Sequence, residues 1–267
     1  MTMRESAKAM VWGDFTLNAA DYGQRPPYDH RVLSALVGIV RQRFGRVCLA
    51  EIGAGTGNLL RSFVDRDISG YAAEPNPAMR SVAHELAPLE RRFEWTGGTA
   101  EKTELPDGCV DWVILGNAYP FVDTVAMFRE AQRVLVPGGF LTIAWNVRDF
   151  QRDPLQNSIE ETVKAMVPNL KRTGSSVAEI MEGIETEGLF RDFLYVEGKH
   201  IQAFSPERFV ATWKAGCDVP SQVSPALWDQ IIEKTRAMTP NTDEIQTRWL
   251  TRTWTLESTA VTADGRS

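Results

Sequence analysis

A short apolar run that leads directly into three closely spaced glycines is the feature that most constrains the fold. Residues 47–52 read Val-Cys-Leu-Ala-Glu-Ile, which suits a buried parallel strand, and Gly53-Ala-Gly-Thr-Gly57 follows at once. Because glycine has no β-carbon, this backbone can turn sharply and approach a ligand closely. A helix predicted from Asn58 to Val64 would point its free N–H groups at that ligand. The sequence therefore predicts a strand, a ligand-binding turn and a helix in succession.

Strands and helices alternate over the next hundred residues. Apolar runs predict strands at 68–73, 92–96, 110–115 and 140–145, and helical spacing predicts helices at 77–86 and 122–135. Pro137-Gly-Gly139 is expected to stop the second of these helices. Such alternation predicts an α/β fold that is doubly wound, with a mostly parallel sheet, helices on both faces and right-handed crossovers.

The regular alternation is flanked by less regular segments. Upstream, a Pro-rich approach segment from Tyr22 to Tyr28 leads into a helix predicted at 29–43 and closed by Gly45. Downstream, residues 153–186 are expected to form helices over the site. Ser205 is predicted to cap a helix that starts at Pro206. The remaining predictions are strands at 193–202 and 249–257, a helix at 225–238 and a disordered tail at 262–267.

Composition excludes several classes of protein. The 267 residues carry a formal charge of −6, which disfavours nucleic acid as a partner because nucleic-acid-binding proteins usually present a basic face. Three scattered cysteines without a Cys-x-x-Cys pair argue against a metal centre. We find neither a signal peptide nor an apolar stretch long enough to span a membrane, so a cytoplasmic protein is expected.

The spacing of the glycines separates two kinds of nucleotide site. A dinucleotide-binding turn reads G-x-G-x-x-G/A, whereas here Asn58 occupies the third glycine position and Gly57 comes one residue early. This disfavours NAD, and the absence of G-K-[ST] excludes a P-loop. A tight turn of an ordinary α/β protein remains an alternative at this point.

Polar groups follow the next three strands of the predicted sheet. Glu74 ends the second strand, 17 residues after Gly57, where a carboxylate can accept hydrogen bonds from both hydroxyls of a ribose. The alternative is that Glu74 caps the following helix. Gly98-Thr-Ala-Glu101 follows the third strand, where backbone groups could reach an adenine edge, and Gly116-Asn-Ala118 ends the fourth strand.

With these motifs in place, residues 47–146 resemble class I S-adenosylmethionine-dependent methyltransferases. The resemblance is to the type 11 and type 25 group, which includes trans-aconitate, ubiquinone-pathway and natural-product enzymes. The matching motifs are Glu51–Gly57, Glu74–Met79, Ala100–Glu101 with Leu105–Pro106, and Arg133–Gly139. Tyr22–Tyr28 and Trp145–Asp149 are also similar to segments of this group.

The resemblance implies a Rossmann-like, seven-stranded sheet with a helical cap inserted after strand five. It also implies one methyltransferase domain over residues 1–267. Its parts would be an approach segment and helix (1–45), a cofactor-binding core (46–150), a helical cap (151–190), C-terminal strands and helices (191–257) and a tail (258–267).

The cofactor implied by the resemblance is S-adenosylmethionine, with S-adenosylhomocysteine as product. Gly53 and Gly55 would line its methionine part, Glu51 would hold its ammonium through water, and Arg25 would pair with its carboxylate. Glu74 would bind the ribose, and Pro75 or Met79 would pack on the adenine. The complete expected cofactor-binding set is Tyr22, Arg25, Glu51, Gly53, Ala54, Gly55, Gly57, Glu74, Pro75, Met79, Thr99, Ala100, Glu101, Asn117 and Ala118.

One departure concerns catalysis. Relatives often carry a His-Trp pair after the fourth strand, where this chain has Tyr119-Pro-Phe121. Because methyl transfer has an excellent leaving group, alignment can supply much of the acceleration, and a base is needed only for a nucleophile that must lose a proton. The candidate catalytic residues are His30, Tyr28 and Tyr119, and the candidate acceptor-binding residues are Trp12, Tyr28, Trp145, Asn146, Arg148 and Trp213.

The sequence therefore predicts a methyltransferase that acts on an oxygen or nitrogen of a small, planar secondary metabolite. Tryptophan is abundant near the expected site, and flat aromatic walls suit a flat acceptor. Two alternatives stay open: a non-catalytic relative that keeps the nucleotide site, and an NAD(P)-dependent reductase. Methylation of RNA or protein is disfavoured because no dense Lys/Arg stretch is present. We expect a monomer or homodimer without a membrane partner.

Overall fold

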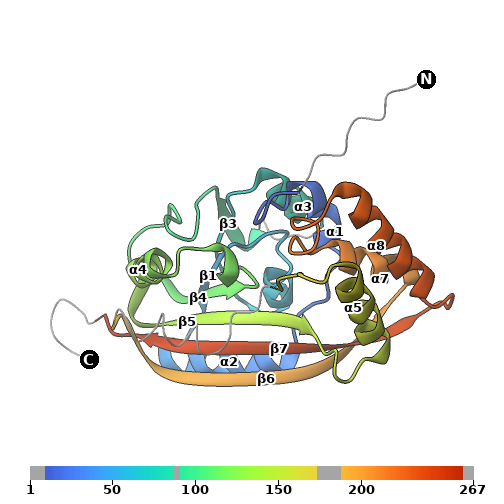
Figure 1. Cartoon of the computed structure of the whole chain (residues 1–267). Coiled ribbons are helices and arrows are strands. Elements are labelled where there is room, and N and C mark those ends of the chain that lie inside the picture. Colours follow the sequence, from blue (N-terminus) through green and yellow to red (C-terminus); the bar gives the residue numbers. More distant parts are fainter. Residues whose placement is uncertain (1–9, 87–90, 173–187, 261–267) are drawn as a thin grey trace.

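Seven strands form one sheet in the order β3-β2-β1-β4-β5-β7-β6 (Figure 1). The structure is a computed structural model that describes residues 10–86, 91–172 and 188–260. The strands are β1 Cys48–Ile52, β2 Ser69–Ala73, β3 Phe93–Thr96, β4 Val110–Gly116, β5 Leu135–Arg148, β6 Phe190–Phe204 and β7 Ile245–Ser258. Neighbours among β1 to β5 run parallel, whereas β7 runs antiparallel to both β5 and β6. The predicted mostly parallel, doubly wound α/β fold is confirmed.

The helices lie close to where the sequence places them. They are η1 Thr16–Asn18, α1 Ala19–Tyr22, α2 His30–Phe44, η2 Leu60–Arg66, α3 Pro77–Leu86, η4 Tyr119–Phe121, α4 Thr124–Val134, α5 Pro154–Met166, α7 Pro206–Lys214 and α8 Pro225–Met238. The bounds of α3 and α8 agree with the predictions. The helix predicted from Asn58 to Val64 is present as the 3-10 helix η2, which begins two residues later, at Leu60, after Gly57 with its φ of +71°.

Helices cover both faces of the sheet because the central strands are apolar on both sides. In β4, Trp112 and Ile114 belong to the core cluster that contains α2 and η2. Val113 and Leu115, which alternate with them, belong to the opposite cluster with α4. This alternation of period two is what a strand buried on both faces requires.

Polar caps and a glycine determine where several helices begin and end. Asp29 caps α2 by accepting a hydrogen bond from the backbone N–H of Arg31 at 2.8 Å, and Gly45 closes the same helix with a φ of +72°. Ser205 caps α7 as predicted, through the N–H of Arg208 at 3.3 Å. No helix among the described residues has the length and apolar content needed to cross a membrane.

The last three strands are longer than predicted. β5 begins at Leu135 rather than at Phe140, because Pro137-Gly-Gly139 lies in an irregularity of its pairing with β4 instead of in a connecting turn. β5 also pairs with β7 as far as Arg148 opposite Trp249. This extension carries the end of β5 beyond the parallel core.

Helices α5, α7 and α8 gather at that end of the sheet, away from α4 (Figure 1). They share a core cluster with the ends of β6 and β7, including Phe204 and Trp249. The predicted cap is therefore built only in part from residues 151–190, since α7 and α8 complete it. Residues 173–187 of the predicted cap and the tail from 261 lie outside the described residues.

Candidate functional site

The glycine turn after β1 is held in a conformation that larger residues would strain. Gly53 and Gly55 have φ values of +68° and +56°. The N–H groups of Gly53 and Ala54 both donate to the carbonyl of Ala73 at the end of β2, at 2.8 and 3.1 Å. A β-carbon on Gly53 would lie 2.7 Å from that of Ala118, so the turn packs directly against the end of β4.

Glu74 connects this turn to the start of α3. Its Oε2 accepts a hydrogen bond from the N–H of Gly55 at 2.8 Å, and its Oε1 accepts one from the N–H of Asn76 at 2.8 Å. Burial raises the pKa of Glu74 above its ordinary value, while these backbone hydrogen bonds act in the opposite direction. The sequence left open that Glu74 caps α3. The cap is instead Asn76, whose Oδ1 accepts a hydrogen bond from the N–H of Ala78.

Glu51 presents a buried carboxyl group with an unused acceptor. It is 2% exposed, and its Oε2 has no hydrogen-bond partner among the described residues. Burial, and then the nearby Glu74, raise the pKa of Glu51 well above its ordinary value. A buried acceptor without a partner is costly, and a cationic ligand group would compensate this cost. The site therefore fits the ammonium of S-adenosylmethionine that the resemblance assigns to Glu51.

A cavity of about 240 Å³ opens above these groups, at the carboxyl ends of β1, β2 and β4. Eleven of the predicted cofactor-binding residues line it: Tyr22, Gly53, Gly55, Glu74, Pro75, Met79, Thr99, Ala100, Glu101, Asn117 and Ala118. Six further lining residues were not in the predicted set: Gly13, Phe15, Asn76, Gly116, Phe121 and Val122. We call this space the cofactor cavity. Its position at the point where the strand order reverses is typical of ligand sites in α/β sheets.

An ion-pair network holds the loop that follows β3 against α4. Glu130 accepts hydrogen bonds from the N–H and hydroxyl of Thr103, at 2.6 and 2.5 Å, and from Nε of Arg133 at 2.8 Å. Burial acts to raise the pKa of Glu130, but the hydrogen bonds from Arg133 and Thr103 outweigh it and lower the pKa to about 2. The network thus anchors Thr103 to α4, in the same loop as the cavity-lining residues Thr99 and Ala100.

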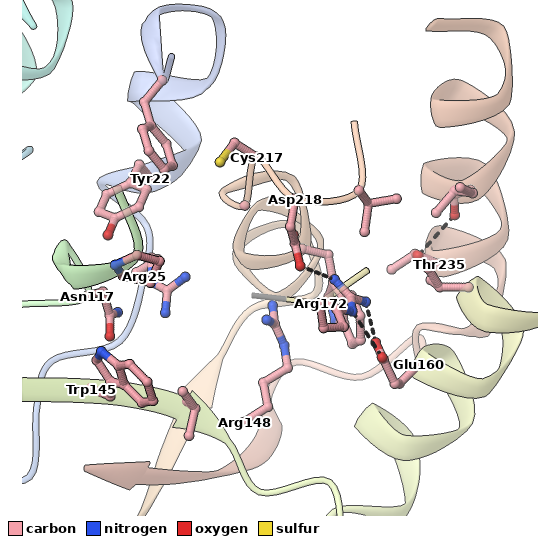
Figure 2. Close-up of a pocket in the computed structure, with 18 of the residues that line it drawn as sticks. Tyr22, Arg25, Asn117, Trp145, Arg148, Glu160, Arg172, Cys217, Asp218 and Thr235 are labelled. Carbon is pink, nitrogen blue, oxygen red and sulfur yellow. Dashed lines mark hydrogen bonds and ion pairs between the residues drawn. The ribbon is translucent and has the colours of Figure 1, made fainter. Parts of the chain in front are cut away.

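A second cavity, of about 430 Å³, adjoins the first under α5, α7 and α8 (Figure 2). The two cavities share four lining residues: Phe15, Tyr22, Asn117 and Phe121. Three of the predicted acceptor-binding residues line the second cavity, namely Trp145, Arg148 and Trp213. We call it the acceptor cavity. Its walls are largely aromatic and aliphatic, with arginines among them.

Sequence reasoning missed most of the far half of the acceptor cavity. That half is lined by Glu160, Arg172, Asp218, Trp228 and Ile232, which come from α5, the segment after it, the α7–α8 connection and α8. None of these residues belongs to a local motif. Only the packing of the cap brings them together, so no signal in the sequence could have found them.

Arg25 lines the acceptor cavity rather than the cofactor cavity. Its Nη2 donates to the carbonyl of Asn146 at 2.8 Å, and its guanidinium lies 5.4 Å from the centre of the Tyr22 ring. Arg25 therefore stands at the junction of the two cavities, close to the shared residue Tyr22. Its pairing with a methionine carboxylate stays a prediction.

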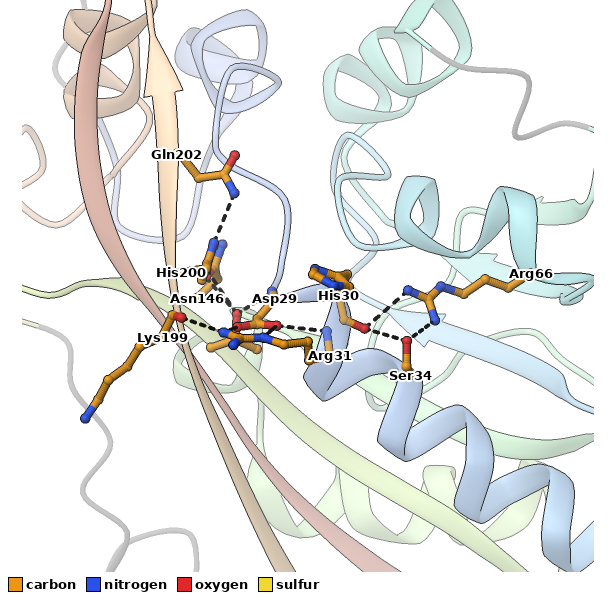
Figure 3. A network of polar contacts seen from close by, with 10 residues as sticks. Asp29, His30, Arg31, Ser34, Arg66, Asn146, Lys199, His200 and Gln202 are labelled. Carbon is orange, nitrogen blue, oxygen red and sulfur yellow. Dashed lines mark hydrogen bonds and ion pairs between the residues drawn. The ribbon is translucent and has the colours of Figure 1, made fainter.

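Asn146 lies outside the lining of either cavity, in a buried polar network (Figure 3). Its Nδ2 donates to the carbonyls of Pro26 and Pro27, at 3.2 and 2.9 Å, and its Oδ1 interacts with Nε2 of His200 at 3.1 Å. These bonds tie the approach segment to β5. Asn146 positions Arg25 instead of facing an acceptor itself.

The three candidate catalytic residues also lie outside the lining of both cavities. His30 is exposed at the start of α2, where its carbonyl accepts from Ser34 (Figure 3). Tyr28 and Tyr119 are buried, 5% and 6% exposed. Burial raises the pKa of Tyr28 well above its ordinary value, which disfavours a phenolate base at neutral pH.

The remaining predicted residues lie near the two cavities but do not line them. Ala54 and Gly57 lie within the glycine turn but do not line the cofactor cavity, and neither does Glu51. Trp12 is 42% exposed and packs against Phe121, with ring centres 4.9 Å apart. Phe121 lines both cavities, whereas Trp12 lines neither of them. In the described ranges, no three His, Cys, Asp or Glu side chains gather as metal ligands.

Comparisons with known proteins agree with this geometry. Residues 50–143 match the methyltransferase domain family. An uncharacterized methyltransferase of Mycobacterium tuberculosis is 34% identical over 125 residues, which are 47% of this chain and 48% of the relative. One from Schizosaccharomyces pombe is 28% identical over 149 residues, 52% of this chain and 55% of the relative. The chain thus spans about half the length of the curated relatives it matches.

Solved structures share the fold over most of the chain. A protein from Anaeromyxobacter dehalogenans, assigned to type II methyltransferases, has a TM-score of 0.57 at 18% identity, covering 88% of this chain and 97% of its own. The YcgJ protein of Bacillus subtilis has a TM-score of 0.51 at 18% identity, covering 84% of this chain and 98% of its own. Similarity at this level of identity concerns the fold.

Proposed function

We propose that this chain, whose residues 50–143 match the methyltransferase domain family, is a class I S-adenosylmethionine-dependent methyltransferase that transfers a methyl group to an oxygen or nitrogen atom of a small, planar acceptor. The acceptor is a secondary metabolite held in the acceptor cavity. Proximity and alignment supply most of the acceleration.

The observation that carries this proposal is the junction of the two cavities. Phe15, Tyr22, Asn117 and Phe121 border both of them, and Asn117 is a residue that the resemblance places at the methionine end of the cofactor. An acceptor in the larger cavity would therefore meet the reactive end of a nucleotide bound in the smaller one. In-line displacement requires this end-to-end arrangement of nucleophile and methyl group.

The residues of the cofactor cavity suit S-adenosylmethionine at both ends. When bound, that cofactor supplies a methyl group on a positively charged sulfur, which is an excellent leaving group. Glu74 has one backbone donor on each oxygen, so each oxygen keeps a lone pair for a ribose hydroxyl. Glu51 does not line the cavity, so its unpartnered oxygen would reach the ammonium through water.

The acceptor cavity offers little acid–base chemistry. Of the described residues, no histidine lines it, and its carboxylates Glu160 and Asp218 are both paired with Arg172. Burial raises the pKa of Cys217 to about 11, so this thiol stays protonated at neutral pH. These facts support a mechanism in which an acidic or already ionised acceptor is aligned, and its nucleophilic atom needs no strong base.

Neither alternative function is favoured by an observation of the structure. A non-catalytic nucleotide-binding relative would have a filled acceptor site, whereas here a cavity of about 430 Å³ adjoins the cofactor cavity. A reductase often uses a Tyr-x-x-x-Lys pair. Tyr195 and Lys199 have that spacing, but they lie on β6, outside both cavities, and each contacts Glu197.

Calorimetry tests the cofactor, and product formation tests the reaction. We expect S-adenosylmethionine and S-adenosylhomocysteine to bind the full chain with one-to-one stoichiometry and NAD not to bind. A panel of phenols, flat heterocycles and carboxylic acids should then contain acceptors that yield S-adenosylhomocysteine. Binding of NAD in place of the sulfonium nucleotide would overturn the proposal.

A further inference from the structure

Arg148, the last residue of β5, brings a positive charge into the acceptor cavity (Figure 2). Its guanidinium lies 4.2 Å from the centre of the Trp213 ring and 5.1 Å from that of Trp249, so aromatic faces hold it in place. Its Nη2 donates to the carbonyl of Thr212 at 2.7 Å. These contacts fix the plane of the guanidinium but supply no negative charge.

Two N–H donors at this position are buried and unused. Nε of Arg148 and the indole Nε1 of Trp213 have no hydrogen-bond partner among the described residues. Nη1 of Arg148 likewise donates to none of them, although a guanidinium carries five N–H donors in a planar fork. Unsatisfied buried donors are rare in folded proteins and indicate a missing acceptor.

The other arginines at the far side of the cavity are already paired. Arg172 donates to Glu160 through Nε at 3.0 Å and to Asp218 through Nη1 at 2.7 Å. Arg252 donates through Nε to Glu197 at 2.8 Å. The carboxylates that face the cavity are therefore committed to Arg172 and leave Arg148 without an ion-pair partner.

Arg148 and Arg25 are thus the two cationic lining residues without a carboxylate among the described residues. Figure 2 shows the guanidinium of Arg148 pointing from β5 into the space between Arg25 and Arg172. Burial, and to a smaller extent the charges of Arg25 and Arg172, lower the pKa of Arg148 to about 9, against the opposing attraction of Asp218 and Glu160. At neutral pH this positive charge still lacks compensation, which a ligand anion would provide.

We propose that the acceptor is a small aromatic carboxylate whose carboxylate group is bound by the guanidinium of Arg148. A planar fork held between indole rings matches the two oxygens of a carboxylate. The apolar body of the acceptor packs on the aromatic wall that Trp145, Trp228 and Phe121 contribute. The proposal names the class of acceptor for the proposed function. It depends on that function for the statement that a methyl group is transferred, whereas the binding of the carboxylate does not depend on it.

The test compares two ligands of the same shape and different charge. Calorimetry at pH 7.5 measures 2-naphthoate and the neutral 2-naphthamide on the full chain, alone and with S-adenosylhomocysteine. We expect naphthoate to bind at least about tenfold more tightly, the lower end of what a hydrogen bond to a charged group contributes. The R148M variant should lose this preference and keep its affinity for naphthamide.

A matched control separates the site from the overall charge. Arg236 lies on α8, is 52% exposed and does not line the acceptor cavity, so R236M should keep the full preference. If R148M fails to fold, R148K is measured instead. Lysine keeps the charge but cannot form the planar fork, so the preference should fall severalfold.

Three results would overturn the proposal. They are equal binding of acid and amide to the unmodified chain, no binding of naphthoate at millimolar concentration, and a preference that survives unchanged in R148M or, in its place, R148K. A chain that prefers naphthoate but does not bind S-adenosylhomocysteine would instead contradict the proposed function. Failure of one proposal is therefore distinguishable from failure of the other.

Discussion

Replacement of Glu74 by glutamine should weaken cofactor binding, because the carboxylate oxygens of Glu74 hold the glycine turn and also face the ribose. Each oxygen of Glu74 accepts one backbone hydrogen bond at 2.8 Å, from Gly55 and Asn76, and keeps one lone pair for a ribose hydroxyl. In the E74Q variant, one oxygen becomes an NH₂ group that can accept neither bond. Whichever oxygen is replaced, one backbone hydrogen bond, from Gly55 or from Asn76, and one acceptor for a ribose hydroxyl are lost.

The expected loss of affinity follows from the hydrogen bonds removed. A hydrogen bond to a charged group contributes about 1.5–3 kcal/mol, so removal of one of the two ribose bonds together with the charge should weaken cofactor binding by about 10- to 100-fold. E74A removes both ribose bonds and should weaken it by about 100-fold or more. Calorimetric titration with S-adenosylhomocysteine measures both values.

A structural role of Glu74 has to be separated from its role in binding. Glu94 lies on β3, is exposed and does not line the cofactor cavity, so E94Q controls for the loss of one carboxylate. Thermal unfolding of E74Q without ligand reports whether the turn at Gly55 has been destabilised. If E74Q folds normally and its affinity stays within about twofold of the unmodified chain, the assignment of the ribose to Glu74 is refuted.

The remaining predictions concern the turn and the network behind the site. G53A should lower the melting temperature and abolish measurable cofactor binding, because its β-carbon would lie 2.7 Å from that of Ala118. Gly108 also has a positive φ, +55°, but open space around it, so G108A controls for backbone strain alone. Equal effects of the two substitutions would contradict the clash. E130Q should destabilise the fold by about 2 kcal/mol at pH 7 in urea unfolding, since it breaks the pair with Arg133. Because the folded pKa of Glu130 is about 2 against an ordinary 4.5, its contribution to stability is present above pH 4.5 and is lost as the pH falls toward 2. The stability of E130Q should therefore depend less on pH in that window, and an unchanged pH dependence would argue against the network.

The sequence predicts the parallel core well because the signals there are local. Apolar runs, glycines and helix caps define β1, β4 and α3 within a few residues each. The ends of β5, β6 and β7 were underestimated because antiparallel pairing along neighbouring strands extends them, and a partner strand far away in the sequence leaves no local signal. The helix expected after Gly57 begins later than predicted and is of the 3-10 type, because the turn includes residues that helical spacing alone would assign to the helix.

The two halves of the site differ in the same way. Glu74 and Gly53 belong to ordered motifs, and the structure places both at the cofactor cavity. The acceptor cavity is assembled from β5 and the cap, so only residues beside a motif, such as Trp145 and Arg148, could be anticipated. His30 was selected for its position near the approach segment, but the N-terminus of α2 turns it to the surface.

A crystal structure of the full chain with S-adenosylhomocysteine tests the central claim most directly. We predict that the ribose hydroxyls lie within hydrogen-bond distance of Glu74 and that the sulfur faces the acceptor cavity near Asn117. A nucleotide found elsewhere on the molecule, or a sulfur turned away from that cavity, would contradict the account.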